Sequence, residues 1–366
     1  MNRTLKYTLL TLLWILVAVY VIWSAAAARR GRKARTVSRV EIEVVDSTSQ
    51  GHLVSGAMVR RWIAASRLPI VGTAVDEVDL TAIERLIARN GFVDRAIAYI
   101  DYGAVLHIEI SQRKPLLRLL TDGMNRYVTE EGYVFEAPRA SSLYVPVVTG
   151  GYRPPFPADY SGEVRAHLDM RLAEIDRRIE ELEHEKYPYY RREIENDRDL
   201  AAVRRMRIKR QWWRGESAEA FERRVEELRA EKTRLRRLYR YRSRVCRERI
   251  EQIGARQEAE RAAQKKLEKS YEDFMKLLTF VKIVEEDDFW RSEVVQIAAR
   301  TTPSGALEVE LIPRSGRFTI LFGRLDNVEA KFDKLLRFYR SGLSTIGWET
   351  YRTIDVRYRN QVVCKK

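Results

Sequence analysis

Residue types that commonly do chemistry are few and widely spaced in this 366-residue sequence. No Gly-x-Ser-x-Gly, Walker A, GxGxxG or HExxH motif is present. The histidines and cysteines are His52, His107, His167, His184, Cys246 and Cys364. The histidines suit packed or solvated positions in strands and charged helices. The cysteines form no CxxC pair or metal-ligand cluster, although one long-range disulfide between them remains open.

A run of four acidic residues, EEDD at 285–288, is the densest group of carboxylates. Paired carboxylates could do acid–base work or hold a metal. Four consecutive residues of a helix cannot all face one point, however, so a solvated helix end is the favoured interpretation. We therefore expect no enzyme activity, no cofactor, no metal site and no small-molecule substrate.

The net charge of +15 is concentrated in two segments. Residues 1–40 contain eight Lys/Arg and no acidic residue, and residues 161–270 contain 31 Lys/Arg against 23 Asp/Glu. The rest of the chain is therefore close to neutral. With no RRM, zinc-finger or homeodomain signature, the charge does not predict a nucleic-acid partner.

Residues 7–28 (YTLLTLLWILVAVYVIWSAAAA) carry no charge and are long enough to cross a ~30 Å hydrocarbon core as a helix. This pattern predicts a single transmembrane helix after a short N-terminal tail, residues 1–6. A cleaved signal peptide with its cleavage site at 25–28 is the alternative. Two basic residues precede the segment and six follow it by residue 39, so the positive-inside rule alone would place the rest of the chain in the cytoplasm.

Residues 36–113 predict a small α/β module. Alternating, β-branched stretches indicate strands at 40–45, 92–101 and 104–110, and apolar residues at helical spacing indicate helices at 55–65 and 80–90. Asp79 is the expected N-cap of the second helix. The expected order is β-α-α-β-β.

A β-rich domain is predicted on both sides of a long charged segment, so the expected fold class is α+β. Its first part, residues 114–150, contains short strands separated by Asp-Gly and Glu-Gly turns. Its second part, residues 271–366, predicts helices at 271–284 and 327–339. The predicted strands of this part are 294–299, 307–312, 318–322, 353–358 and 361–364.

Residues 160–270 predict a coiled-coil-like helical hairpin, entered through a proline-rich linker at 152–161. Apolar residues repeat at intervals of four and three from Leu168 to Leu182, and a second run begins at Phe221. Pro188 is expected to kink or break the first arm, and Gly254 to weaken the second. A three-helix arrangement is the alternative.

Two segments are candidate contact sites. The basic and aromatic cluster near the predicted hairpin tip would suit anionic lipid head groups, although tryptophans that cap the hairpin core are the favoured interpretation. Its residues are Arg207, Arg210, Trp212, Trp213 and Arg214. The last predicted strand would expose an unpaired backbone edge to a partner strand, unless it is covered in a closed sheet. Its candidate residues are Tyr358, Asn360, Gln361, Val362, Val363 and Cys364.

The order of these segments, with several local motifs, resembles the FtsQ/DivIB family. The motifs are RKP (113–115), YV (127–128), GYVF (132–135), VPVVTG (145–150), LIPR (311–314), FG (322–323), IDVRY (354–358) and NQVVC (360–364). The α/β module resembles a POTRA (polypeptide-transport-associated) domain. The resemblance covers residues 1–150 and 271–366, whereas the helical segment at 160–270 exceeds the family's usual connection.

The resemblance implies a non-enzymatic bacterial cell-division scaffold. It would be a single-pass inner-membrane protein at the septum, with residues 1–6 as a cytoplasmic tail and most of its mass in the periplasm, against the charge bias. Its closing strand would recruit FtsB/FtsL-like bitopic proteins and link them to the septal peptidoglycan synthase machinery. A POTRA-containing, chaperone-like factor in envelope protein transport or assembly is the alternative.

Overall fold

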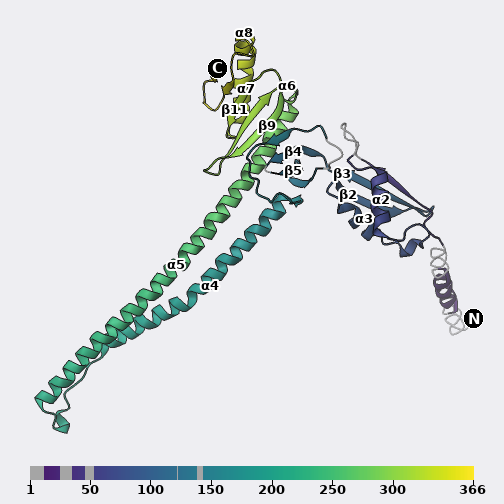
Figure 1. Ribbon diagram of the computed structural model, residues 1–366. Helices are drawn as coiled ribbons and strands as arrows, with labels where there is room; N and C mark the ends of the chain where they lie inside the picture. The colour runs from purple at the N-terminus through teal and green to yellow at the C-terminus, as the bar shows by residue number, and fades with distance from the viewer. Residues whose placement is uncertain (1–11, 25–34, 46–52, 122, 138–142) are drawn as a thin grey trace, which may run out of the picture. The chain divides into compact units, whose positions relative to one another are not determined.

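The computed structural model describes residues 12–24, 35–45, 53–121, 123–137 and 143–366. The chain is an α+β protein with β-sheets and two long helices, as the sequence predicts. It divides into two compact units, one formed by Met1–Val164 with Met275–Lys366 and the other by Arg165–Phe274. We call the second one the hairpin unit. Figure 1 shows the elements of each unit along the chain.

The N-terminal apolar segment is described only in part. Residues 12–24 are helical, with exposed side chains from Leu12 to Trp23. Within the described ranges, no helix is both long and apolar enough to cross a membrane. The remainder of the predicted anchor, the predicted tail and His52 lie outside the described residues.

The α/β module has the predicted β-α-α-β-β order. Its elements are β1 (Arg39–Val44), α2 (Gly56–Ser66), α3 (Leu80–Ala88), β2 (Val93–Ile100) and β3 (Val105–Gln112), with a short 3-10 turn η1 (Val75–Glu77) before α3. The Asp79 carboxylate accepts a hydrogen bond from the Ala82 N–H at 2.9 Å, which confirms the predicted N-cap. Ser55 caps α2 in the same way, through the Met58 N–H.

The three strands of this module form one sheet in the order β1-β3-β2, with β1 parallel and β2 antiparallel to β3. Alternation along the strands sends one set of side chains into a core with α2 and α3. Val59, Ile83, Ile87, Leu106 and Ile108 are buried there. The opposite face carries polar side chains, so the module presents a largely polar sheet surface.

The β-rich parts before and after the hairpin unit join in one ten-stranded sheet. Its order is β13-β12-β11-β10-β9-β7-β4-β5-β6-β8. The strands before the hairpin unit are β4 (Pro115–Thr121), β5 (Met124–Thr129), β6 (Tyr133–Glu136), β7 (Val147–Thr149) and β8 (Gly162–Glu163). Those after it are β9 (Val294–Thr301), β10 (Leu307–Pro313), β11 (Thr319–Gly323), β12 (Thr353–Asp355) and β13 (Val363–Lys365). The two sets meet where β7 runs parallel to both β4 and β9.

Helices pack on the second half of this sheet through aromatic side chains. α7 (Val328–Phe338) supplies Phe332, whose ring lies 5.6 Å from that of Phe280 and 5.0 Å from that of Phe322. Trp290 of α6 (Asp288–Glu293) lies 4.7 Å from the same ring. A π-helical turn η3 (Tyr339–Leu343) and the short α8 (Ser344–Ile346) follow α7. The predicted helix at 271–284 is the end of a longer one, α5 (Ala218–Glu286).

The hairpin unit consists of two antiparallel helices, α4 (Val164–Arg205) and α5, so the three-helix alternative is wrong. Arg247 pairs with Glu193 and Arg256 with Glu185, which sets the antiparallel register. Pro188 lies inside α4 without breaking it, and Gly254 lies inside α5. The described helices therefore tolerate both residues, because packing between the two arms outweighs local propensity.

Polar groups are part of the hairpin interior. The Lys186 ammonium donates to the Gln257 side-chain oxygen, and Gln257 Nε2 donates to Glu183 at 2.9 Å and to the Ile179 carbonyl at 3.2 Å. Lys186 and Gln257 are both buried. Each polar atom of such a network must keep its partner, so it favours one alignment of the two arms over slipped ones.

Candidate docking edge at the C-terminus

The last strand, β13, forms one edge of the ten-stranded sheet. It pairs antiparallel with β12, and the register places Ile354 opposite Cys364 and Asp355 opposite Val363. Within the described part of the chain, no strand pairs with the other side of β13. One row of its backbone groups is therefore open to a partner strand.

The direction of these groups follows from one hydrogen bond. The Arg352 N–H donates to the Lys365 carbonyl at 2.8 Å, so the backbone groups of Lys365 face β12. Because successive residues of a strand turn their backbone groups to opposite sides, those of Cys364 face away from β12. Cys364 is thus the residue of β13 whose N–H and C=O are available to a partner.

An ion pair holds the chain just before this edge. The Arg357 guanidinium donates to the two Asp355 carboxylate oxygens at 2.9 and 2.6 Å, and the Arg357 N–H also donates to Asp355 at 3.0 Å. Gly323 makes room for this arrangement, because a Cβ there would lie 2.6 Å from Arg357 Cγ, and its φ is +75°. Burial by itself raises the pKa of Asp355, but Arg357 holds it below its ordinary value of 3.8.

A lysine of α7 fixes the next residues. Lys334 Nζ donates to the Val356 carbonyl at 2.7 Å and to the Tyr358 carbonyl. Side chains therefore satisfy backbone groups that a longer strand would use in its ladder. This explains why β12 ends at Asp355, whereas the sequence predicted a strand from 353 to 358.

We expect Asp355→Asn to lower the free energy of unfolding by about 1–2 kcal/mol at neutral pH, because hydrogen bonds to a charged group are lost. The folded-state pKa of Asp355 is depressed, so its contribution is complete above pH 3.8 and is lost as pH falls through the folded-state value. The difference between wild type and variant in urea denaturation should therefore shrink below about pH 4. Asp333→Asn on the exposed side of α7 is the control. A difference in unfolding free energy between wild type and Asp355→Asn that stays constant with pH would contradict a stabilising role of the Asp355 carboxylate.

The predicted docking residues occupy two different settings. Val363 and Cys364 lie in β13 and are half-buried, whereas Gln361 and Val362 precede the strand, which begins later than predicted. Tyr358 and Asn360 lie in the exposed turn between β12 and β13. Their role in partner binding stays a prediction.

The residues that hold the chain next to this edge were not predicted from the sequence. These are Asp355, Arg357 and Lys334, and only the D-x-R spacing of the first two indicates that they pair.

A second cluster missed from the sequence lies beneath the same half of the sheet. The buried Glu293 carboxylate accepts hydrogen bonds from the Tyr339 hydroxyl at 3.2 Å, the Ser315 N–H at 3.3 Å and the Ser315 hydroxyl. Burial first, then the neighbouring Glu293, raises the pKa of Tyr339 well above its ordinary value. These groups satisfy one another and tie the loop after β10 to η3, so their arrangement is structural.

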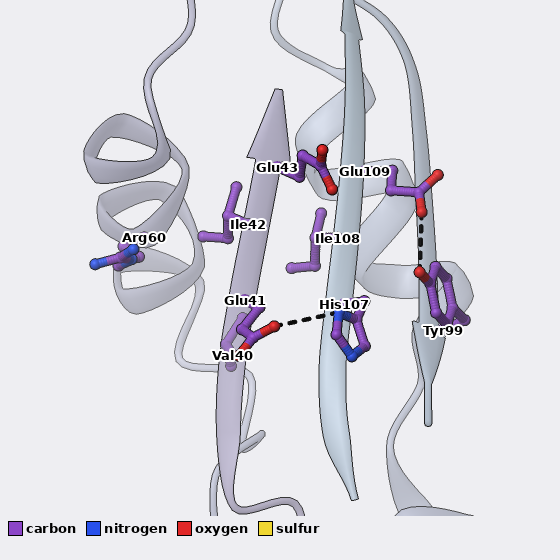
Figure 2. Close-up of a pocket in the computed structure, with 9 residues that line it drawn as sticks. All are labelled: Val40, Glu41, Ile42, Glu43, Arg60, Tyr99, His107, Ile108 and Glu109. Atoms are coloured by element: carbon purple, nitrogen blue, oxygen red, sulfur yellow. Dashed lines mark hydrogen bonds and ion pairs between the residues drawn. The ribbon is translucent and has the colours of Figure 1, made fainter. Parts of the chain in front are cut away.

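The polar face of the α/β module holds a histidine that lies beside two carboxylates. Figure 2 shows His107 of β3 between Glu41 of β1 and Tyr99 of β2. His107 Nδ1 lies 3.5 Å from Glu41, Nε2 lies 3.2 Å from Asp101, and its ring stacks 5.1 Å from that of Tyr99. The adjoining pocket is lined by Glu41, Glu43 and Glu109 together with Arg60, Tyr99 and His107, so its polar groups are mostly acidic.

The remaining candidate groups are placed apart. Within the described ranges, no cluster of three or more histidine, cysteine or acidic residues is arranged to hold a metal ion. Cys246 and Cys364 are both free, so the structure does not contain the disulfide that the sequence left open. In the acidic run, Asp287 caps α6 by accepting from the N–H groups of Phe289 and Trp290. His167 and His184 both lie in α4.

The basic and aromatic cluster lies at the turn of the hairpin unit. Arg207 and Arg210 are in the connection after α4, and a 3-10 turn η2 comprises Trp212–Arg214. Gly215 adopts φ +69°, the left-handed conformation that lets the chain reverse. The sequence favoured tryptophans that cap the hairpin core. Both tryptophans are exposed, so that interpretation is wrong.

Comparisons with known protein families match both ends of the described fold. A family model described as FtsQ/DivIB, C-terminal related, matches residues 257–365. A POTRA-like domain model matches residues 35–111, which include the β-α-α-β-β module except the last residue of β3. A comparison with curated proteins found no match. The FtsQ/DivIB match contains β9 to β13, and thus the edge strand.

Proposed function

Since this chain belongs to the FtsQ/DivIB family of cell-division proteins, we propose that it is a division scaffold that recruits bitopic partners through its C-terminal edge. Both matched domains belong to non-enzymatic classes. FtsB/FtsL-like proteins are the proposed partners, and the septal peptidoglycan synthase machinery is the proposed destination. In this proposal residues 7–28 anchor the chain in the inner membrane and the folded units are periplasmic.

The observation that carries the proposal is the unpaired side of β13. The Cys364 backbone groups face away from β12. The Asp355–Arg357 ion pair and the hydrogen bonds of Lys334 fix the chain between β12 and β13. An extended partner segment could add a strand here, with each new main-chain hydrogen bond worth about 0.5–1.5 kcal/mol. A rigid edge lowers the ordering cost of such binding.

The competing interpretation is a protected edge. β13 has only three residues, and lysines occur at 365 and 366. Short strands and lysines are common devices against edge-to-edge aggregation. The same features are compatible with selective docking, because a lysine-flanked edge favours a partner that brings acidic residues beside its pairing strand.

Cys364→Pro tests the proposal. Proline removes the outward N–H of Cys364 while the pairing of β12 with its neighbours on β13 is retained, since edge strands tolerate proline on the open side. We expect recovery of co-expressed FtsB-like and FtsL-like proteins with the tagged full-length chain to fall at least about tenfold, the equivalent of one or two main-chain hydrogen bonds. Cys364→Ser keeps the N–H and is the matched control, and Arg229→Ala on α5 is the remote one.

Circular dichroism and thermal unfolding must show that each variant is folded. Undiminished partner recovery with folded Cys364→Pro would remove this edge from the interface. Failure of the wild-type chain to retain either partner would contradict the scaffold role itself. Retention of unfolded envelope proteins in place of these partners would favour the chaperone-like alternative. Of the two matched domains, the POTRA-like module is the one compatible with that alternative.

A further inference from the structure

The turn of the hairpin unit is ordered by its own contacts. We define the tip as residues 204–216. The Glu216 carboxylate accepts from the Gln211 N–H at 2.5 Å and from Arg224 at 2.6 Å. The Gln211 N–H, and then Arg224, hold the pKa of Glu216 below its ordinary value. Arg210 donates to the Glu216 carbonyl at 3.1 Å, so the connection between the helices is held at both ends.

This ordered turn presents two tryptophans to solvent. Trp212 is 76% exposed and Trp213 is 62% exposed. Their rings lie 6.1 Å apart in an edge-to-face arrangement. Exposing most of the surface of two adjacent tryptophans to water is unfavourable, and such exposure is unusual. Exposed apolar groups of this kind mark interaction sites. Because they project from a reverse turn, they are suited to insertion into a partner and not to enclosing one.

The charge around the tryptophans is of one sign. The tip contains six basic residues and one acidic residue, Glu216, which is already engaged. Arg204 and Arg205 lie in the last turn of α4, where they also complement the helix dipole. The exposed Arg207, Lys209 and Arg214 pair with no carboxylate among the described residues. Three cations near the tryptophans in the sequence therefore have no carboxylate partner in the described part of the chain.

We propose that the tip binds the surface of a membrane that contains anionic phospholipids. Tryptophan partitions to the boundary between head groups and acyl chains, and arginine and lysine pair with the phosphates just above it. A single exposed turn with both residue types can satisfy both layers at once. A nucleic-acid site usually has a longer basic groove with several aromatic side chains on which bases stack. The two helices next to the tip carry charges of both signs, so they do not extend the basic surface.

The proposal is independent of the docking edge, since the tip and β13 belong to different units of the chain. Variants of the tip and variants of the docking edge can therefore be tested separately.

The test uses the full chain held in phosphatidylcholine nanodiscs, so that its apolar N-terminal segment is already in lipid. Flotation then measures binding to added vesicles of phosphatidylcholine with about 30 mol% phosphatidylglycerol, whose negative surface potential attracts basic segments. We expect binding to these vesicles, little binding to pure phosphatidylcholine vesicles, and weakening by salt. Trp212→Ser/Trp213→Ser and Arg207→Gln/Lys209→Gln/Arg214→Gln should each reduce the partition coefficient by about tenfold or more, since each basic residue near the surface contributes about fivefold.

Arg234→Gln/Arg237→Gln/Arg240→Gln is the matched control, because it removes the same charge from exposed positions of α5 outside the tip. It should bind like the wild type. Three results would overturn the proposal: no flotation of the wild type, an equal loss in the control, or vesicle binding that survives both tip variants. Tip-dependent binding of single-stranded DNA without vesicle binding would assign the turn to nucleic acid.

Discussion

Phe332→Ala is expected to lower the free energy of unfolding of the domain that carries the docking edge by about 3–5 kcal/mol. Phe332 is buried where α7 meets the sheet, with the rings of Phe280, Phe322 and Trp290 within 5.6 Å of its own. Removing this ring leaves a cavity that the neighbouring aromatic side chains cannot fill without leaving their own contacts.

The effect should reach the docking edge because α7 also carries Lys334, which holds the chain between β12 and β13. Chemical denaturation followed by near-ultraviolet circular dichroism measures the loss. Phe289→Ala is the matched control, since the Phe289 ring is 41% exposed and touches the same cluster from its rim. It should cost about 1 kcal/mol, in the range of a single aromatic pair. Equal losses of unfolding free energy in the two variants would mean that Phe332 is not at the centre of this core.

Gly150→Ala is expected to cost about 2–4 kcal/mol and to loosen the junction between the two parts of the ten-stranded sheet. Gly150 follows β7 with φ +102°, a conformation that alanine rarely adopts. An added Cβ would also press directly on the Ala299 carbonyl oxygen of β9. Strand β7 is the only link between β4 and β9 in the described sheet, so a shift here separates the strands before the hairpin unit from those after it.

Gly151→Ala is an adjacent control, because a Cβ at that position meets no atom within 4 Å. Thermal unfolding should shift strongly for Gly150→Ala and little for Gly151→Ala. Hydrogen exchange should show faster opening of β7 and β9 in the first variant only. A mild effect of Gly150→Ala, similar to that of its neighbour, would mean that β7 does not hold the two parts together.

Elements that depend on local spacing were predictable from the sequence. The alternation around Ile42, the helical spacing before Asn90 and the Asp79 cap are decided within a few residues, and the α/β module has the predicted order. The hairpin follows the same logic, since a repeat of four and three residues places Leu168, Ile175 and Leu182 on one buried face. Short-range geometry suffices wherever one face of an element must be apolar.

Other features depended on partners far along the chain. Nothing in the sequence near Val148 indicates that β7 will pair with Ile297 of β9, on the far side of the hairpin unit. The end of β12 was predicted three residues too late, because the side chains of Lys334 and Asp355 satisfy backbone groups of Val356 and Arg357 that the local pattern would assign to a strand. Buried carboxylates such as Glu293 read as surface residues until their partners are known.

The two candidate contact sites divide along the same line. The sequence by itself determined which residue types gather at 204–214 and at the C-terminus, because composition and order are local properties. Only the tertiary structure decided that Trp212 and Trp213 are exposed and that the backbone of Cys364 faces outward. Exposure and strand direction are set by how the chain folds back on itself, through the contacts of Glu216 at the tip and through the pairing of β13 with β12 at the C-terminus.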